Sequence, residues 1–380
     1  MADPTSPPAI PARAANASIF IATIVAIVAV IGVLLSFDVF LARVDRRESD
    51  AHAVDEYDDG VRLLQQGRAS AAVERFGAAT AIDRANVNYA LALGDAMLRA
   101  GRIAEADATL RALLDRAEND GAVNLTMAHV MIREGRDADA NAYFHRAIFG
   151  RWGADSVQRR RQARFEFIDV LAQRSDSSEL LAELLPLEDV SSDSVALQRQ
   201  LGNLFLRAGS PARAANMFRS VLHRDPTDAD AYAGMGDAAL ALGNFRTAQA
   251  DFAEADRLRP NDATLAARLA LTDSVLLLDP TTRGIGDAAR AERSEALLTR
   301  TLAALHECAA PPSALADSAS GLLDRSVPGA ASRAVSGAVR ESTSDAMIGV
   351  AVDLWASRPT SCNRVHPDEA LRLVQLHLAR

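Results

Sequence analysis

The chain has 380 residues, of which 49% are hydrophobic and only 5% aromatic, and its formal net charge is −9 at pH 7. An acidic balance argues against general nucleic-acid binding, because that function needs a basic face to neutralise phosphates. Alanine and leucine dominate the composition, and long alternating runs of β-branched residues are rare. The chain is therefore predicted to be all-α.

The N-terminal part of the chain predicts a membrane anchor. Residues 1–16 are rich in proline and alanine and are expected to be disordered. Residues 17–37 carry no charge, and as a helix they span about 31 Å, roughly one hydrocarbon core. No small-residue cleavage pattern follows them, so a single uncleaved transmembrane helix is expected rather than a signal peptide. The mixed-charge residues 38–52 are predicted to continue it as a linker helix.

Two features give opposite indications of the side of the membrane. More arginines follow the apolar segment than precede it, which by the positive-inside rule places the soluble part in the cytoplasm. The two cysteines, Cys308 and Cys362, suit one disulfide in an oxidising compartment, with two buried free thiols as the alternative. We expect a bacterial inner-membrane protein with its soluble part in the periplasm, and the cytoplasm is the alternative.

A glycine recurs at a spacing of 34 residues in two sets. These glycines are Gly67, Gly101 and Gly135, followed by Gly209 and Gly243. A small residue lies seven positions before each one, an alanine five positions after it, and a bulky apolar residue four positions further on. The pattern predicts stacked pairs of helices, in which the glycine ends the first helix and the bulky side chain fills the wedge between the two.

This frame resembles the tetratricopeptide repeat family. The resemblance is strongest in residues 195–262, which hold the fifth and sixth units, where Pro226 and Pro260 are expected to stop the second helix. Residues 53–154 hold units one to three, which lack that proline. The resemblance covers roughly half the chain and implies a right-handed α-solenoid with a concave surface that binds protein segments.

The remaining segments fit around these units. Residues 155–194 are predicted to form a degenerate fourth unit, and residues 263–308 a seventh half-unit with a capping helix. The C-terminal segment, residues 309–380, is also helical in pattern. A disulfide between Cys308 and Cys362 would clip this segment to the cap.

The sequence shows no recognisable catalytic chemistry. It contains no P-loop, no GxSxG elbow, no HExxH and no CxxC pair, so no catalytic residue, metal site or cofactor is predicted. His129 and His145 fall in one repeat and are interpreted as interhelix or surface side chains. The alternative is an enzyme with a site in the C-terminal tail, where the nearby candidates are Asp353, Trp355, Cys362 and His366.

The resemblance implies that the first helix of each unit lines the groove. Some family members hold a peptide carboxylate there through basic and amide side chains. Arg199, Asn203 and Arg268 occupy three of the five corresponding positions. Gly234 and Thr264 occupy the other two, so a polar or mixed peptide is expected instead of a full carboxylate clamp.

In units one to three the same face is more apolar. Tyr57 and Leu91 are among the side chains expected to line it. Such a face suits a helix or an apolar peptide, although the linker helix 38–52 could cover it instead.

These observations predict a membrane-anchored scaffold that binds a protein partner in bacterial cell-envelope assembly. The anchor would raise the effective concentration of the groove near membrane-bound partners. A cytoplasm-facing adaptor that recruits a soluble regulator is the alternative, and self-association is left open.

Overall fold

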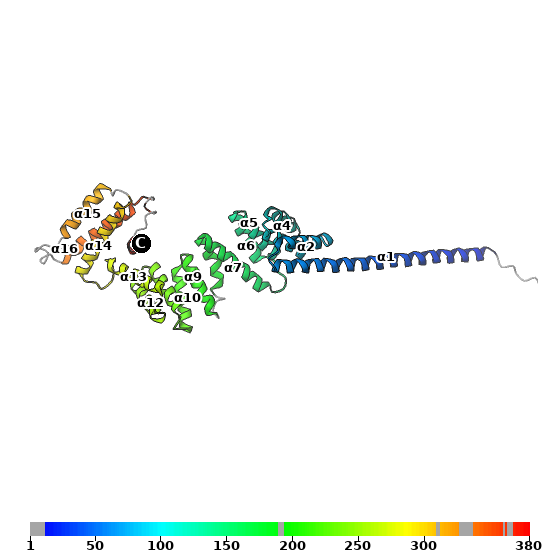
Figure 1. Cartoon of the computed structure of the whole chain (residues 1–380), viewed down its shortest axis with the longest axis horizontal. Coiled ribbons are helices and arrows are strands. Elements are labelled where there is room, and N and C mark those ends of the chain that lie inside the picture. The colour runs from blue at the N-terminus through cyan, green and yellow to red at the C-terminus, as the bar shows by residue number, and fades with distance from the viewer. Residues whose placement is uncertain (1–11, 189–193, 309–311, 327–336, 360–361, 363–367) are drawn as a thin grey trace, which may run out of the picture. The chain divides into compact units, whose positions relative to one another are not determined.

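In the computed structural model, the described residues are 12–188, 194–308, 312–326, 337–359, 362 and 368–380. They form helices joined by turns, and the described part of the chain contains no β-strand. The chain folds as two compact units, residues 1–167 and residues 168–380. Figure 1 shows the succession of helices along the chain. The all-α prediction is confirmed.

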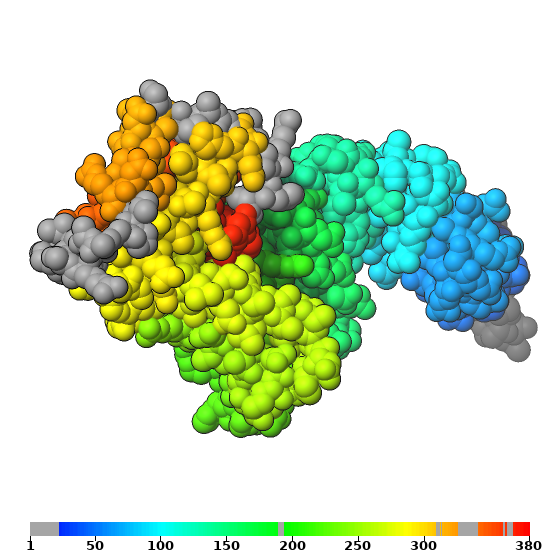
Figure 2. All heavy atoms as spheres, turned by 60° about the vertical axis from the view of Figure 1, so that its left-hand side comes forward, coloured from blue at the N-terminus to red at the C-terminus, as the bar shows by residue number. Residues whose placement is uncertain are grey.

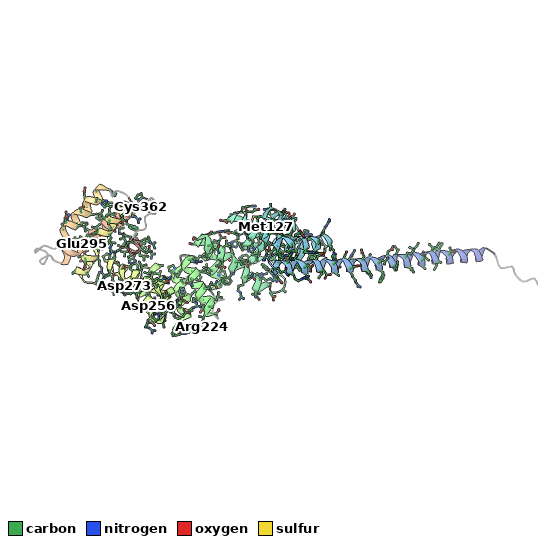
Figure 3. All side chains as sticks on the ribbon, viewed as in Figure 1. Met127, Arg224, Asp256, Asp273, Glu295 and Cys362 are labelled. Atoms are coloured by element: carbon green, nitrogen blue, oxygen red, sulfur yellow. A yellow bond between two sulfur atoms is a disulfide. The ribbon has the colours of Figure 1, made fainter. Side chains whose placement is uncertain are left out.

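The first unit is built from paired helices. Its helices are α1 (Ala12–Gln65), α2 (Ala69–Ile82), α3 (Val87–Arg99), α4 (Ile103–Ala117), α5 (Gly121–Arg133) and α6 (Asp137–Phe149). The helix α7 (Ser156–Arg174) begins in this unit and ends in the next. Met127 of α5, labelled in Figure 3, is fully buried in the core of this unit.

The second unit continues with paired helices and ends in a helical cap. Its elements are α8 (Ser177–Leu184), the 3-10 turn η1 (Leu185–Leu187), α9 (Val195–Arg207), α10 (Pro211–Arg224), α11 (Ala229–Ala241), α12 (Phe245–Leu258), α13 (Ala263–Leu278), α14 (Asp287–His306), α15 (Ser313–Ser326), α16 (Gly337–Ala356) and α17 (Glu369–Leu378). The helix α14 packs against α15 and α16, and α17 packs against α13.

The five periodic glycines end the first helix of each pair, as predicted. Their φ angles lie between 68° and 78°, the left-handed region that glycine adopts without a Cβ penalty. In each case the amide of the next residue donates to a carbonyl in the last turn of that helix, for example Arg102 N to Met97 O at 2.9 Å. This closes the helix and turns the chain into its partner.

The small residue before each glycine makes room for the bulky one of the same unit. A Cβ at Gly60 would lie 2.6 Å from Phe76, and one at Gly236 would lie 2.6 Å from Phe252. Phe76 and Phe252 are almost fully buried. In these two pairs the helices can therefore cross closely only because this position has no side chain.

The turn between successive pairs is closed by a side-chain cap that the glycine period does not reveal. Asp120 caps α5 and Asp228 caps α11, each accepting hydrogen bonds from backbone amides of the first helical turn. Asn86 and Asp262 do the same for α3 and α13. The second helices of the pairs have no such cap at Arg68, Arg102, Arg136, Ser210 or Asn244.

One long helix joins the predicted anchor to the repeats. The helix α1 has 54 residues, so it is about 80 Å long, and it includes the segment 38–52. It begins at Ala12, inside the segment 1–16 that was expected to be disordered, while residues 1–11 lie outside the described part. The reason is local: Pro11 is the last helix breaker, and alanines follow it.

Candidate interaction site

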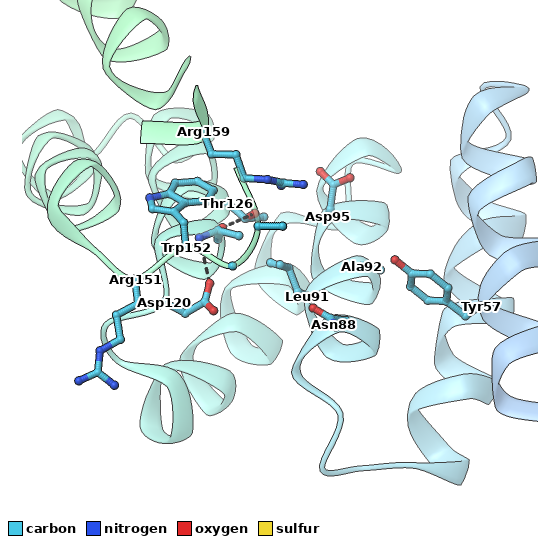
Figure 4. A pocket seen from close by; sticks show the side chains of 13 residues that line it. Tyr57, Asn88, Leu91, Ala92, Asp95, Asp120, Thr126, Arg151, Trp152 and Arg159 are labelled. Carbon is cyan, nitrogen blue, oxygen red and sulfur yellow. Dashed lines mark hydrogen bonds between the residues drawn. The ribbon is translucent and has the colours of Figure 1, made fainter. Parts of the chain in front are cut away.

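A cavity lies on the face formed by the first helices of the pairs in the first unit. Its volume is 480 Å³, and it is lined by Tyr57, Asn88, Leu91, Ala92, Asp95, Asp120, Ala122, Thr126, Arg151, Trp152, Gly153, Ala154 and Arg159. These residues come from α1, α3, α5, the α6–α7 connection and α7. We call it the Tyr57–Trp152 cavity, and Figure 4 shows its lining.

One wall of the cavity is a strap between α6 and α7. Arg151 forms a two-bond β-bridge with the turn before α5: its amide donates to Asn119 O and its carbonyl accepts from Gly121 N, both at 2.7 Å. Trp152 Nε1 donates to Ala147 O at 2.8 Å, which fixes the indole ring. A Cβ at Gly121 would lie 2.2 Å from that ring, so the close packing depends on glycine.

Tyr57 and Leu91, two of the residues predicted for the groove of the first unit, both line this cavity. Tyr57 is partly buried, and its ring centroid lies 5.4 Å from that of Phe76 and 5.2 Å from that of Tyr89. Leu91 is also partly buried and packs against the core of α3, α4 and α5. The sequence did not predict Trp152 as a residue of this site. Trp152 stands at the repeat position that proline holds in units five and six, and this difference is the signal that the turn is irregular.

The other predicted residues lie in the second unit, where acidic side chains engage both bases. Arg199 Nη1 lies 3.0 Å from Asp228 Oδ2 and 3.5 Å from Asp230 Oδ2. Arg268 Nη1 lies 3.0 Å from Asp237 Oδ2. Burial raises the pKa of the Asp237 carboxyl above its ordinary value, and the charge of Arg268 offsets only part of that rise. Asn203 is exposed on α9.

The helix α17 covers one end of the same face in the second unit. Its residues Leu373, Leu376 and His377 line a 340 Å³ cavity together with Asp237 and Leu240 of α11. Figure 2 shows α17 in red, seated in a hollow between yellow α14 and the yellow-green α12 and α13. Asp237 and Leu240 of α11 therefore share this cavity with the chain's own C-terminal helix.

The cysteines are joined in the structure. A disulfide connects Cys308, just after α14, to Cys362, which is labelled in Figure 3. Because Cys362 is bonded, its sulfur is not a free nucleophile for the alternative site in the tail. The guanidinium of Arg358 stacks over Trp355 at 4.0 Å, and His366 lies outside the described residues.

A histidine–glutamate pair between α5 and α7 was not predicted. His129 Nε2 lies 3.1 Å from Glu166 Oε2, and this contact lowers the pKa of Glu166 below its ordinary value. His145 meets Phe167 edge-on. Among the described residues, no group of three or more His, Cys, Asp or Glu side chains is placed to hold a metal ion.

The repeat pattern and the fold are similar to those of known proteins. A family model described as "Tetratricopeptide repeat" matches residues 63–129 and 205–271. No curated protein matches the chain. Among solved structures, the C-terminal part of a TPR repeat-containing protein from Cytophaga hutchinsonii is 12% identical, and the alignment covers 64% of this chain and 94% of that one with a TM-score of 0.44.

Two further structures have similar folds. PilW, described as a widely conserved type IV pilus biogenesis factor, is 18% identical, with 57% of this chain and 98% of that chain covered and a TM-score of 0.38. The TPR2AB domain of yeast Sti1, solved in complex with pHSP90, is 17% identical, with 65% and 89% covered and a TM-score of 0.28. At these identities the likeness concerns the fold alone.

Repeated helix pairs with a glycine turn and a small-residue crossing define a helical repeat protein. The 34-residue period and the matched segments identify the chain as a tetratricopeptide repeat protein. Repeats of this class generally act as protein-interaction scaffolds and not as catalysts.

Proposed function

We propose that this chain is a membrane-anchored scaffold that binds a segment of a protein partner in the Tyr57–Trp152 cavity. The observation that carries the proposal is the cavity itself: 480 Å³ of space across three first helices, with Tyr57 and Leu91 on its wall. Its helices are preformed, so little ordering cost opposes binding. In the second unit, by contrast, the bases on the equivalent face are ion-paired, and α17 lines a 340 Å³ cavity together with α11.

The anchor is supported by α1. It is the one helix in the described part of the chain that is long and apolar enough to cross a membrane, and its large apolar side chains from Ile24 to Val44 are exposed. A span over residues 17–37 would leave the rest of α1 to connect the bilayer with the first repeat.

A periplasmic location and a role in envelope assembly are part of the proposal. A disulfide between Cys308 and Cys362 supports an oxidising compartment. The arginines after the apolar segment favour the opposite orientation, a cytoplasm-facing adaptor. An alkaline phosphatase fused after residue 380 should be active in cells if the soluble part is periplasmic, and a β-galactosidase fused there should be active if it is cytoplasmic.

The binding function can be tested with peptides. Full-length chain in phosphatidylcholine nanodiscs should enrich members of a phage-displayed library of random 12-residue peptides. Leu91→Arg, which places a charged side chain on the cavity wall, should abolish the enrichment. Ala108→Arg, at an exposed position of α4, should leave it unchanged. Failure of the unaltered chain to enrich any peptide would contradict the proposal.

A further inference from the structure

We infer that two copies of this chain associate through α1, as a parallel two-stranded coiled coil over residues 30–54. The inference goes beyond the proposed function, because it concerns a second copy and not the occupant of the Tyr57–Trp152 cavity. It takes from that proposal only the membrane anchor, which gives both copies the same orientation. The observations that carry it are the exposure of α1 and the spacing of its apolar side chains.

Within the described part of the chain, α1 runs unpacked until it reaches the repeats. Every residue from 23 to 52 is exposed, and Ala53 is the first buried one. Figure 1 shows this part of α1 running apart from the other helices of the first unit. A lone helical stretch of about 15 residues, such as the one between the proposed span and Ala53, is marginal in water. A partner along it would therefore stabilise the chain.

The apolar side chains of this stretch follow the spacing of a coiled coil. Successive positions are separated by three and four residues in turn, as the a and d positions of a heptad are. We call these positions the α1 seam: Val30, Val33, Phe37, Phe40, Val44, Arg47, Ala51 and Val54. The six large apolar side chains among them are between 44% and 67% exposed. From Arg43 to Val54, beyond the proposed span, the one apolar residue outside the seam is Ala53, and that residue packs in the repeat core.

The α1 seam lies on the side of the helix that faces away from the repeats. Ala53 is buried against the first repeat, and Gly60 faces Phe76. With 3.6 residues per turn, Val44 and Ala51 lie about 160–180° around the helix from Ala53. A second copy can therefore pack along the seam without meeting the repeats of the first.

The charges beside the seam favour a parallel pair of helices. In such a pair the g position of one helix lies next to the e position of the other, one heptad further on. Arg43 of each copy then lies next to Glu48 of the other, which gives two attractive pairs. Asp50 and Asp55 take the next such positions and repel each other. The pairing is therefore weakest at its last turn, where α1 enters the repeats.

The seam also indicates the number of strands. Val44 is β-branched at an a position, which favours two strands. Arg47 is the one charged residue of the seam, and a single polar residue there costs stability but fixes the register and the oligomeric state. The membrane adds the alignment, because two anchored copies meet side by side at the same height and at a raised effective concentration.

The first test places single cysteines on and off the seam of the full-length chain, in phosphatidylcholine vesicles at low protein density. The native cysteines are bonded to each other, so the new thiol is the reactive one. Under mild oxidation Val44→Cys and Ala51→Cys should give disulfide-linked dimers. Ala42→Cys and Ser49→Cys are the matched controls, because each lies two residues earlier on the opposite side of α1 and is exposed. Both controls should lose the dimer.

The second test reverses the charges beside the seam. Arg43→Glu should lower the dimer affinity about tenfold, because it turns two attractive pairs into two repulsive ones. Glu48→Arg should do the same, and the double variant should regain the affinity of the unaltered chain. Residues five positions apart on one helix do not face each other, so this rescue reports a contact between copies. Sedimentation equilibrium in dodecyl maltoside measures the affinity, and circular dichroism should show equal helicity.

The outcomes separate this inference from the proposed function. Equal dimer formation on and off the seam, no dimer at any position, or a trimer in sedimentation overturns the inference. Linkage at residue 44 without linkage at residue 51 overturns it too, since the contact would then end beside the lipid. A double variant as weak as the single ones contradicts the parallel register.

Flotation with the vesicles checks the anchor by itself. A chain that floats but does not pair leaves the proposed function standing. A chain that does not float contradicts the anchor, and this inference with it.

Discussion

At the scale of single residues, glycine does two different things in this fold. At the helix ends it supplies positive φ, as at Gly101 with 78°. At the helix crossings it supplies space, as at Gly60 beside Phe76. Both tasks repeat with the period, and both depend on residues close in the sequence.

The crossing glycines can be tested by adding one methyl group. Gly60→Ala should destabilise the first unit by about 1–3 kcal/mol, because overpacking a close helix crossing forces backbone shifts. Gly77→Ala is the control: a Cβ there meets nothing within 4 Å, and alanine is the better helix former. Thermal unfolding followed by circular dichroism should lower Tm for Gly60→Ala and keep or raise it for Gly77→Ala. Equal changes in both would refute the crossing argument.

A half-buried carboxyl in α12 makes stability depend on pH. Burial raises the pKa of Asp251 from 3.8 to about 6, and among the described residues its Oδ2 has no hydrogen-bond partner. The folded chain therefore retains a proton that the unfolded chain releases, so this group's stabilising contribution is fully present below about pH 4 and is lost as the pH rises through about 6.

Asp251→Asn removes this dependence. At pH 8 the variant should be more stable than the unaltered chain by roughly 1 kcal/mol, a figure reduced from the full pKa shift because the side chain is partly solvated. At pH 4 the two should have nearly the same Tm. A difference that is the same at both pH values would contradict the assignment.

The sequence predicted the backbone roles better than the side-chain pairings. The turn glycines and buried aromatics follow from a period that can be counted, and the structure confirms them. The partners of Arg199 and Arg268 lie on neighbouring repeats, where a small rotation of a helix decides whether a carboxylate is reached. The sequence shows acidic residues near these two arginines. It did not predict that these residues would form ion pairs with them.

At the scale of elements, the strap between α6 and α7 shapes the candidate site. Its shape could not be derived from the repeat pattern, because it exists only where that pattern breaks. Gly121→Ala should displace the Trp152 ring, since the new Cβ would lie 2.2 Å from it. The expected results are a shift in Trp fluorescence and weaker peptide binding, while the helicity stays the same. Unchanged fluorescence and binding would contradict the claim that the Trp152 ring and the cavity depend on Gly121.

The helix α17 and the disulfide form the second element-scale feature. The bond joins residues 54 positions apart, and in the chain-entropy view such a loop contributes about 4 kcal/mol. Reduction should therefore speed amide hydrogen exchange in α14 and α17 and leave α3 to α6 unchanged. Mass spectrometry of exchange with and without reductant measures this, and equal exchange in both states would contradict a stabilising role for the bond.

At the scale of the whole molecule, the account combines an apolar helix, two compact units of paired helices and the Tyr57–Trp152 cavity into a membrane-bound scaffold. The sequence predicted the order of these parts because each has a compositional or periodic signature. It did not predict how the face of the second unit is occupied, since that depends on where α17 and the internal ion pairs lie.

The most direct test of the central claim is photo-crosslinking in living cells. A photoreactive amino acid at Leu91, on the wall of the Tyr57–Trp152 cavity, should give a discrete adduct with another protein, while the same group at exposed Ala108 on α4 should not. Adducts at both positions, adducts containing only copies of this chain, or no adduct at Leu91 would contradict a scaffold that binds its partner in this cavity.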